Sequence, residues 1–122
     1  MNIEKIKYED KPIASITGNE FIIKDLGSAL DFAMSVQYEN ETNRIAISKE
    51  LICDEFFVLS TGIAGDILQK FVTYDVKLAI YGDFSVYNSK PLKDFIYESN
   101  KGKDFFFVPT LDEAVLKLGK AR

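Results

Sequence analysis

Five short stretches of the chain carry the apolar patterns of β-strands. Residues 3–8 interleave apolar and charged positions, as a half-exposed strand does. Residues 12–17 follow after only a three-residue turn, so the two stretches predict an antiparallel hairpin. Residues 44–48, 76–82 and 104–108 are short, apolar runs that are typical of buried strands.

Four longer stretches have apolar residues at helical spacing. The first begins after Asp25, a residue type that often caps a helix N-terminus, and has an apolar face made of Leu26, Ala29, Leu30, Ala33 and Val36. The second begins near Asp54, with a stripe made of Phe56, Leu59, Ile63, Ile67 and Phe71. Pro91 fits the first turn of the third predicted helix. Thr110 and Glu113 have the spacing of a capping box at the start of the fourth.

The predicted order of elements is β-β-α-β-α-β-α-β-α. Strands that alternate with helices indicate a mainly parallel sheet, because parallel neighbours require crossover connections. The opening hairpin adds an antiparallel pair. We therefore predict an α/β fold with a mixed sheet of about five strands and four helices, formed by residues 1–122 as a single domain.

Composition narrows the class of protein. The chain has 122 residues, of which 47% are hydrophobic and 28% charged, and these values are ordinary for a soluble globular protein. Its net charge of −4 argues against nucleic-acid binding, which needs a clustered basic face. No apolar run approaches the roughly 20 residues of a membrane span, and the first residues do not resemble a signal peptide. We therefore expect a cytoplasmic protein with neither a nucleic-acid nor a membrane partner.

The residue types that are missing limit the chemistry. The chain has no histidine, which removes the usual near-neutral general base and the common catalytic triads. Its single cysteine, Cys53, has apolar neighbours and is interpreted as a small buried residue. Carboxylates near helix starts are explained by the helix dipole. We assign no catalytic residue, metal ligand or cofactor, and we expect the protein not to be an enzyme.

Polar and aromatic residues follow two of the predicted parallel strands. Ligands of open α/β sheets bind at the carboxyl ends of such strands. The candidate ligand- or partner-binding residues are Ser48, Lys49, Asp83, Phe84, Ser85, Tyr87 and Lys90. A purely structural interpretation is also open: Asp83 and Ser85 would satisfy turn amides, Ser89 would cap the third helix, and the aromatic rings would fold onto the core.

The stretch "VLSTGIAGDILQKF", residues 58–71, allows two geometries. In one, a helix begins near Ser60 and presents the Thr61 hydroxyl in its first turn. In the other, the helix begins near Asp54, and Thr61 and Gly62 lie inside it, where a small residue permits close packing. We favour the second geometry, because the apolar stripe runs through the triplet without a stop signal.

The whole chain resembles a STAS domain, the fold of bacterial anti-sigma factor antagonists. The likeness rests on the order of elements and on "LSTGIAG" and "FFFVPTLDEAVLKL". It implies a regulatory protein partner, and by position it makes Thr61 the candidate phosphorylation site. Leu59 stands where those antagonists have aspartate.

A second resemblance covers nearly the full length of the chain. "CDEFFVLSTGIAGDILQKF" and "KLAIYGDFSVYNSKPLKDFIYESNKGKDFFF" are similar to an uncharacterised bacterial family, domain of unknown function 4180. This resemblance implies no activity.

Two functions follow as expectations. The first is an interaction module that binds a regulatory protein partner. The second is a small-molecule or lipid sensor that uses the strand-end loops as a pocket. A preformed apolar cavity near Asp83 would favour the sensor, whereas a flat, exposed aromatic patch there would favour the partner.

Overall fold

The computed structural model describes residues 1–122 and contains one five-stranded sheet whose spatial order is the order of the chain. The strands are β1 (Asn2–Tyr8), β2 (Lys11–Thr17), β3 (Arg44–Ser48), β4 (Lys77–Tyr81) and β5 (Phe105–Val108). The β1–β2 pair is antiparallel and the remaining pairs are parallel. The predicted mixed, mainly parallel sheet is therefore confirmed.

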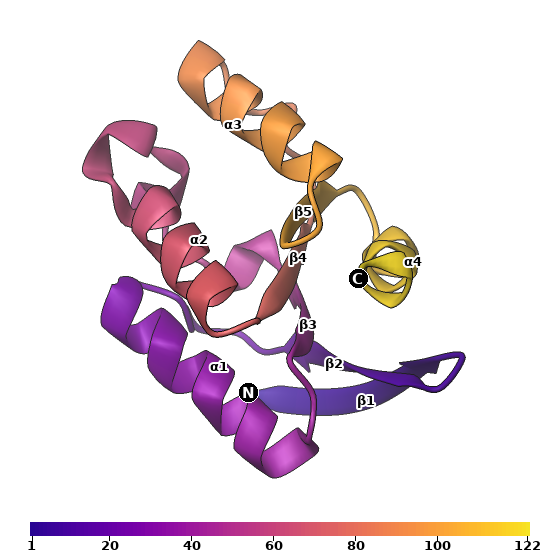
Figure 1. Cartoon of the computed structure of the whole chain (residues 1–122). Helices are drawn as coiled ribbons and strands as arrows, with labels where there is room; N and C mark the ends of the chain where they lie inside the picture. The colour runs from indigo at the N-terminus through magenta and orange to yellow at the C-terminus, as the bar shows by residue number, and fades with distance from the viewer.

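The four helices are distributed unequally over the two faces of the sheet. The crossover helices α1 (Leu26–Asn40), α2 (Ile63–Thr73) and α3 (Lys90–Lys101) lie on one side, and α4 (Leu111–Lys120) lies alone on the other (Figure 1). The α/β fold with four helices that the sequence predicted is confirmed, although the start of α2 is displaced.

Side-chain caps fix the starts of three helices. The Asp25 carboxylate accepts a hydrogen bond from the Ser28 amide at 2.8 Å, and the Ser28 hydroxyl accepts one from the Asp25 amide, forming a reciprocal box. The Ser89 hydroxyl accepts from the Leu92 amide at α3, and the Thr110 hydroxyl accepts from the Glu113 amide at α4. These caps satisfy amides that have no partner within the helix.

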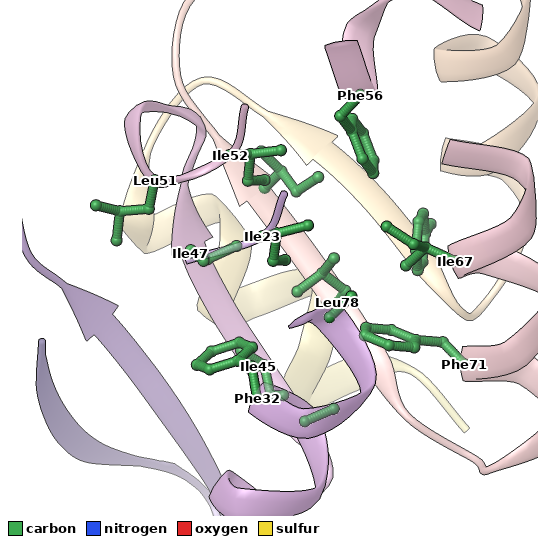
Figure 2. Packing of buried hydrophobic residues seen from close by; sticks show 14 of the residues in the cluster. Ile23, Phe32, Ile45, Ile47, Leu51, Ile52, Phe56, Ile67, Phe71 and Leu78 are labelled. Atoms are coloured by element: carbon green, nitrogen blue, oxygen red, sulfur yellow. The ribbon is translucent and has the colours of Figure 1, made fainter. Parts of the chain in front are cut away.

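The larger core lies between the sheet and the three crossover helices. In Figure 2, Ile45 and Leu78 of the sheet face Phe32 of α1 and Phe71 of α2. Full burial of side chains of this size contributes about 1.5–3 kcal/mol each. Ile47 and Ile80 extend this core to the carboxyl ends of β3 and β4.

A smaller core lies beneath α4, where Ile13, Ala46, Ala79 and Phe106 of the sheet meet Ala114 and Leu118 of the helix. At Gly119, α4 comes so close to β1 that an added Cβ would lie 2.2 Å from the Tyr8 ring. The ammonium of Lys11 donates to the Gly119 carbonyl at 2.8 Å, and the guanidinium of Arg44 donates to the Leu118 and Ala121 carbonyls. Two cations of the sheet thus bind the negative end of the α4 dipole.

The prediction of a helix from Asp54 is wrong. Residues 54–57 and 59–61 form separate single turns of 3₁₀-helix, and α2 begins only at Ile63. The apolar stripe still points inward, because Phe56, Ile67 and Phe71 are buried in one core and Leu59 and Ile63 pack against it. Spacing alone did not distinguish a continuous helix from short turns that bury the same residues.

Candidate functional site

Two strand-end residues from the predicted cluster meet directly. Lys49 follows β3 and Asp83 follows β4, and the Lys49 ammonium donates to the Asp83 carbonyl at 2.6 Å. Between them, the aliphatic part of Lys49 lies across Gly82, where a Cβ would approach the lysine Cγ to 2.7 Å. Gly82 also has a φ of +153°, which favours glycine. Lys49 and Asp83 therefore lie together at the carboxyl ends of the neighbouring parallel strands β3 and β4.

The Lys49 ammonium also lies against aromatic rings. Its nitrogen is 5.0 Å from the centre of the Tyr87 ring and 6.0 Å from that of Phe84. Both distances fall within the range of a cation–π interaction. Lys49 therefore connects the ends of β3 and β4 to the loop that leads into α3.

Asp83 and Ser85 form a compact turn. The Asp83 carboxylate accepts hydrogen bonds from the Ser85 hydroxyl at 2.6 Å and from the Ser85 amide at 2.9 Å. These two bonds favour the ionised form and lower the pKa of Asp83 below its ordinary 3.8. The pair satisfies its own turn, as the structural interpretation of this loop expected.

The two aromatic residues of the loop fold back onto the core. The Tyr87 ring stacks on Phe57 with centres 5.0 Å apart, and Phe84 meets Phe107 edge to face at 5.5 Å. Partial burial, together with the negative charges of Asp54 and Glu50, raises the pKa of Tyr87 above its usual 10.0. Tyr87 therefore stays protonated at neutral pH.

Two predicted site residues lie outside this network. The Ser48 hydroxyl accepts a hydrogen bond from the Glu50 amide and caps the short turn after β3. Lys90 belongs to α3 and pairs with Asp94 on the same helix at 2.7 Å, where both side chains are well exposed. The structure thus brings together Lys49, Asp83, Phe84, Ser85 and Tyr87, but shows no contact of Lys90 with them.

The Ser60-Thr61-Gly62 triplet follows neither of the two expected geometries. Thr61 is exposed and comes two residues before α2; its hydroxyl donates toward the carbonyls of Val58 and Glu55 and accepts from the Ile63 amide. Gly62 adopts the left-handed conformation, with φ +80°, at the junction with α2. The favoured packing geometry is therefore wrong: Gly62 allows the backbone to turn and does not contact a neighbouring element closely.

An apolar groove lies beside the cluster, and the sequence reasoning missed it. It has a volume of about 340 Å³ and is lined by residues 57–60, 87–89, 91 and 92. Val58 at its rim is 51% exposed, and Val86 in the adjacent loop is 60% exposed. The sequence pattern did not reveal the groove, because residues 57–60 were predicted to lie within a helix. A second open hollow, of about 360 Å³, is lined by residues 82–84 and 107–109.

The structure contains no group of three or more cysteine, aspartate or glutamate side chains placed to hold a metal ion. None of its helices combines the length and the apolar character needed to cross a bilayer.

The order and pairing of the strands define an α/β protein with a mixed, mainly parallel five-stranded sheet. The chain belongs to the family described as "Domain of unknown function (DUF4180)", whose model matches residues 8–118. Searches of curated proteins and of solved structures find no match.

Proposed function

We propose that the protein is a non-enzymatic, cytoplasmic interaction module that binds a regulatory protein partner through its strand-end surface. This surface consists of the apolar groove with Val58 at its rim, the exposed Val86 in the loop that leads to the groove, and the Lys49–Tyr87 contact. The observation that carries the proposal is the groove together with two exposed aliphatic side chains in or next to its lining segments. Exposed apolar surface with a polar rim is typical of protein-binding sites.

The resemblance to STAS domains supports the regulatory part of the proposal. The order of elements and the "LSTGIAG" stretch suggest an anti-sigma factor antagonist-like module of bacterial origin. On this reading Thr61 is the phosphorylation candidate, and its exposed position would give a kinase access. Mass spectrometry of the native protein tests the assignment: phosphate is expected on Thr61, and phosphate found only on Ser60 would contradict it.

Paired valine substitutions test the docking surface. A tagged protein with Val58→Asp and Val86→Asp should lose a partner that the wild-type protein retains from a lysate of its own organism. The matched control is Val72→Asp on α2, because Val72 is 49% exposed and lies outside the groove. Equal recovery of the partner by the double variant and the control would refute the proposal.

A small-molecule or lipid sensor is the alternative proposal. It is favoured by the hollow beside Asp83, whose volume of about 360 Å³ falls within the range of ligand pockets and whose lining includes Phe84 and Phe107. Its open shape weighs against it. A panel of medium-chain fatty acids should raise the Tm saturably if this alternative holds, and Phe84→Ala should remove the effect. An unchanged Tm across the panel would leave the protein partner as the better proposal.

A further inference from the structure

The two edges of the sheet are treated differently. At the β5 edge, the side-chain amide of Asn100 of α3 takes the place of a neighbouring strand. Its oxygen accepts from the Phe107 amide at 2.7 Å and its nitrogen donates to the Phe107 carbonyl at 3.1 Å. The protein itself therefore pairs the outward backbone of Phe107, which shields this short edge strand from pairing along its full length.

The β1 edge has no such cover. β1 is seven residues long, and all seven pair with β2 in one regular register without a bulge or proline. No side chain of the molecule hydrogen-bonds to the outward backbone of β1. In Figure 1, β1 forms the outermost strand of the sheet, with its far side away from β2 unpaired. A regular open edge of this length can accept another strand.

The side chains along β1 specify which strand fits. Lys5 and Lys7 are exposed and lie on one face of the sheet, because alternate residues of a strand share a face. Ile6 and Tyr8 lie on the other face and are only partly buried. An adjacent strand that alternates acidic and apolar residues would place acids opposite the lysines and apolar side chains opposite Ile6 and Tyr8. Such opposed pairs stabilise a sheet.

A second copy of the chain is a poor occupant of this edge. When a two-fold axis relates two β1 strands, the strands run antiparallel to each other. Three registers of this pairing include five or more residues of each strand. The register centred on residue 4 places Glu4 opposite Glu4. The register centred on residue 5 places Lys5 opposite Lys5, and the one centred on residue 6 places Lys5 opposite Lys7. Like charges directly opposite each other destabilise the pairing. These like-charge pairs therefore oppose self-association, whereas Lys5 and Lys7 attract an acidic strand.

We propose that the β1 edge is a docking site for an extended segment of an unlike protein in which acidic and apolar residues alternate. The segment adds a sixth strand beside β1, and its acids pair with Lys5 and Lys7. The β1 edge is separate from the groove of the proposed function, so an experiment can refute one of the two proposals without refuting the other.

Two designed hexapeptides and a charge-reversed protein test this docking site. Acetyl-Val-Glu-Val-Glu-Thr-Val-amide places glutamates opposite Lys7 and Lys5 in an antiparallel pairing, and the control peptide has lysines in place of the glutamates. Titration is followed by the backbone amide signals of β1 in NMR spectra. The glutamate peptide should bind about tenfold more tightly than the lysine peptide, because two attractive pairs replace two repulsive ones.

The protein variant Lys5→Glu/Lys7→Glu should reverse that preference, and Lys5→Gln/Lys7→Gln should abolish it. Both residues are exposed, so the fold should persist, and circular dichroism checks that it does. Several outcomes would overturn the proposal: no shift of β1 amides with either peptide, equal affinities, or an unreversed preference. Sedimentation that shows a wild-type dimer, which an excess of the glutamate peptide dissociates, would likewise assign the edge to a second copy.

Discussion

Lys77 is the only buried charged residue of the molecule, with 2% of its surface exposed. Its ammonium donates to the Lys103 carbonyl at 3.0 Å and lies 3.6 Å from the carboxylate of Asp104. A buried charge is tolerated only when it is paired and hydrogen-bonded, and Lys77 meets both conditions. The contact joins the start of β4 to the residue before β5.

Lys77→Met should therefore destabilise the protein strongly. The substitution leaves the Asp104 carboxylate, whose side chain is only 22% exposed, without its partner. Breaking a buried pair costs about 3–5 kcal/mol, and the partial exposure of Asp104 places the loss near the lower value. Lys90→Met is the matched control, because its pair with Asp94 is exposed and is worth about 0.5 kcal/mol or less. The free energies of unfolding in urea compare the two.

Asp83 provides a prediction for acidic pH. Its pKa in the folded protein is lowered by the Ser85 hydroxyl and amide, whereas the unfolded chain has the ordinary value of 3.8. A lowered folded pKa means that the contribution to stability is present above pH 3.8 and is lost as the pH falls through the folded value.

An NMR titration of the Asp83 carboxyl should give a midpoint below 3.8 in the wild-type protein. In Ser85→Ala the midpoint should move upward toward 3.8, because the larger of the two hydrogen-bond effects is removed. An unchanged midpoint would mean that the hydroxyl does not bind the carboxylate in solution.

At the scale of elements, local signals were sufficient wherever a helix carries its own cap. Asp25 and Thr110 identified two helix starts from sequence, and Pro91 placed a third. The segment before α2 has no such signal. Its turns are stabilised by the Thr61 hydroxyl reaching back to the carbonyls of Val58 and Glu55, and side-chain spacing does not encode that contact.

Two glycines near the start of α2 should respond to alanine substitution in opposite directions. Gly62→Ala places a side chain at φ +80°, where the left-handed conformation costs about 1–2 kcal/mol. Gly65→Ala lies within α2, where an added Cβ meets nothing within 4 Å, so helix propensity should stabilise the protein by up to about 1 kcal/mol. Thermal unfolding of the two variants should shift the Tm downward and upward respectively. A stabilising Gly62→Ala would show that α2 begins earlier than described.

At the scale of the whole molecule, the sequence predicted the alternation of elements but not the contacts that join distant segments. The meeting of Lys49 and Asp83 could be foreseen, because parallel strands end on one side of a sheet. The bond from Lys11 to Gly119 spans 108 residues, and that from Arg44 to Ala121 spans 77. Both depend on how α4 crosses the sheet, and no local pattern specifies that crossing. The groove at Val58 was missed because the turns that form it were predicted as helix.

The close approach of α4 to the hairpin can be measured by a double-mutant cycle. Gly119→Ala should destabilise the protein by about 1–3 kcal/mol, because the new methyl group overlaps the Tyr8 ring. In a Tyr8→Ala background the same substitution should cost far less, since the ring is absent. Equal costs in both backgrounds, measured by urea unfolding, would mean that α4 does not pack against the hairpin in this way.

The lone helix α4 also has a consequence for biosynthesis. Every other element can pack against neighbours that have already left the ribosome, because spatial order follows chain order. The apolar residues Ile13, Ala46, Ala79 and Phe106 remain uncovered until α4, the last element of the fold, emerges. During that interval the nascent chain exposes a contiguous apolar face that chaperones recognise. Any slowing of translation after β5 should therefore lengthen the time during which the nascent chain is prone to aggregate.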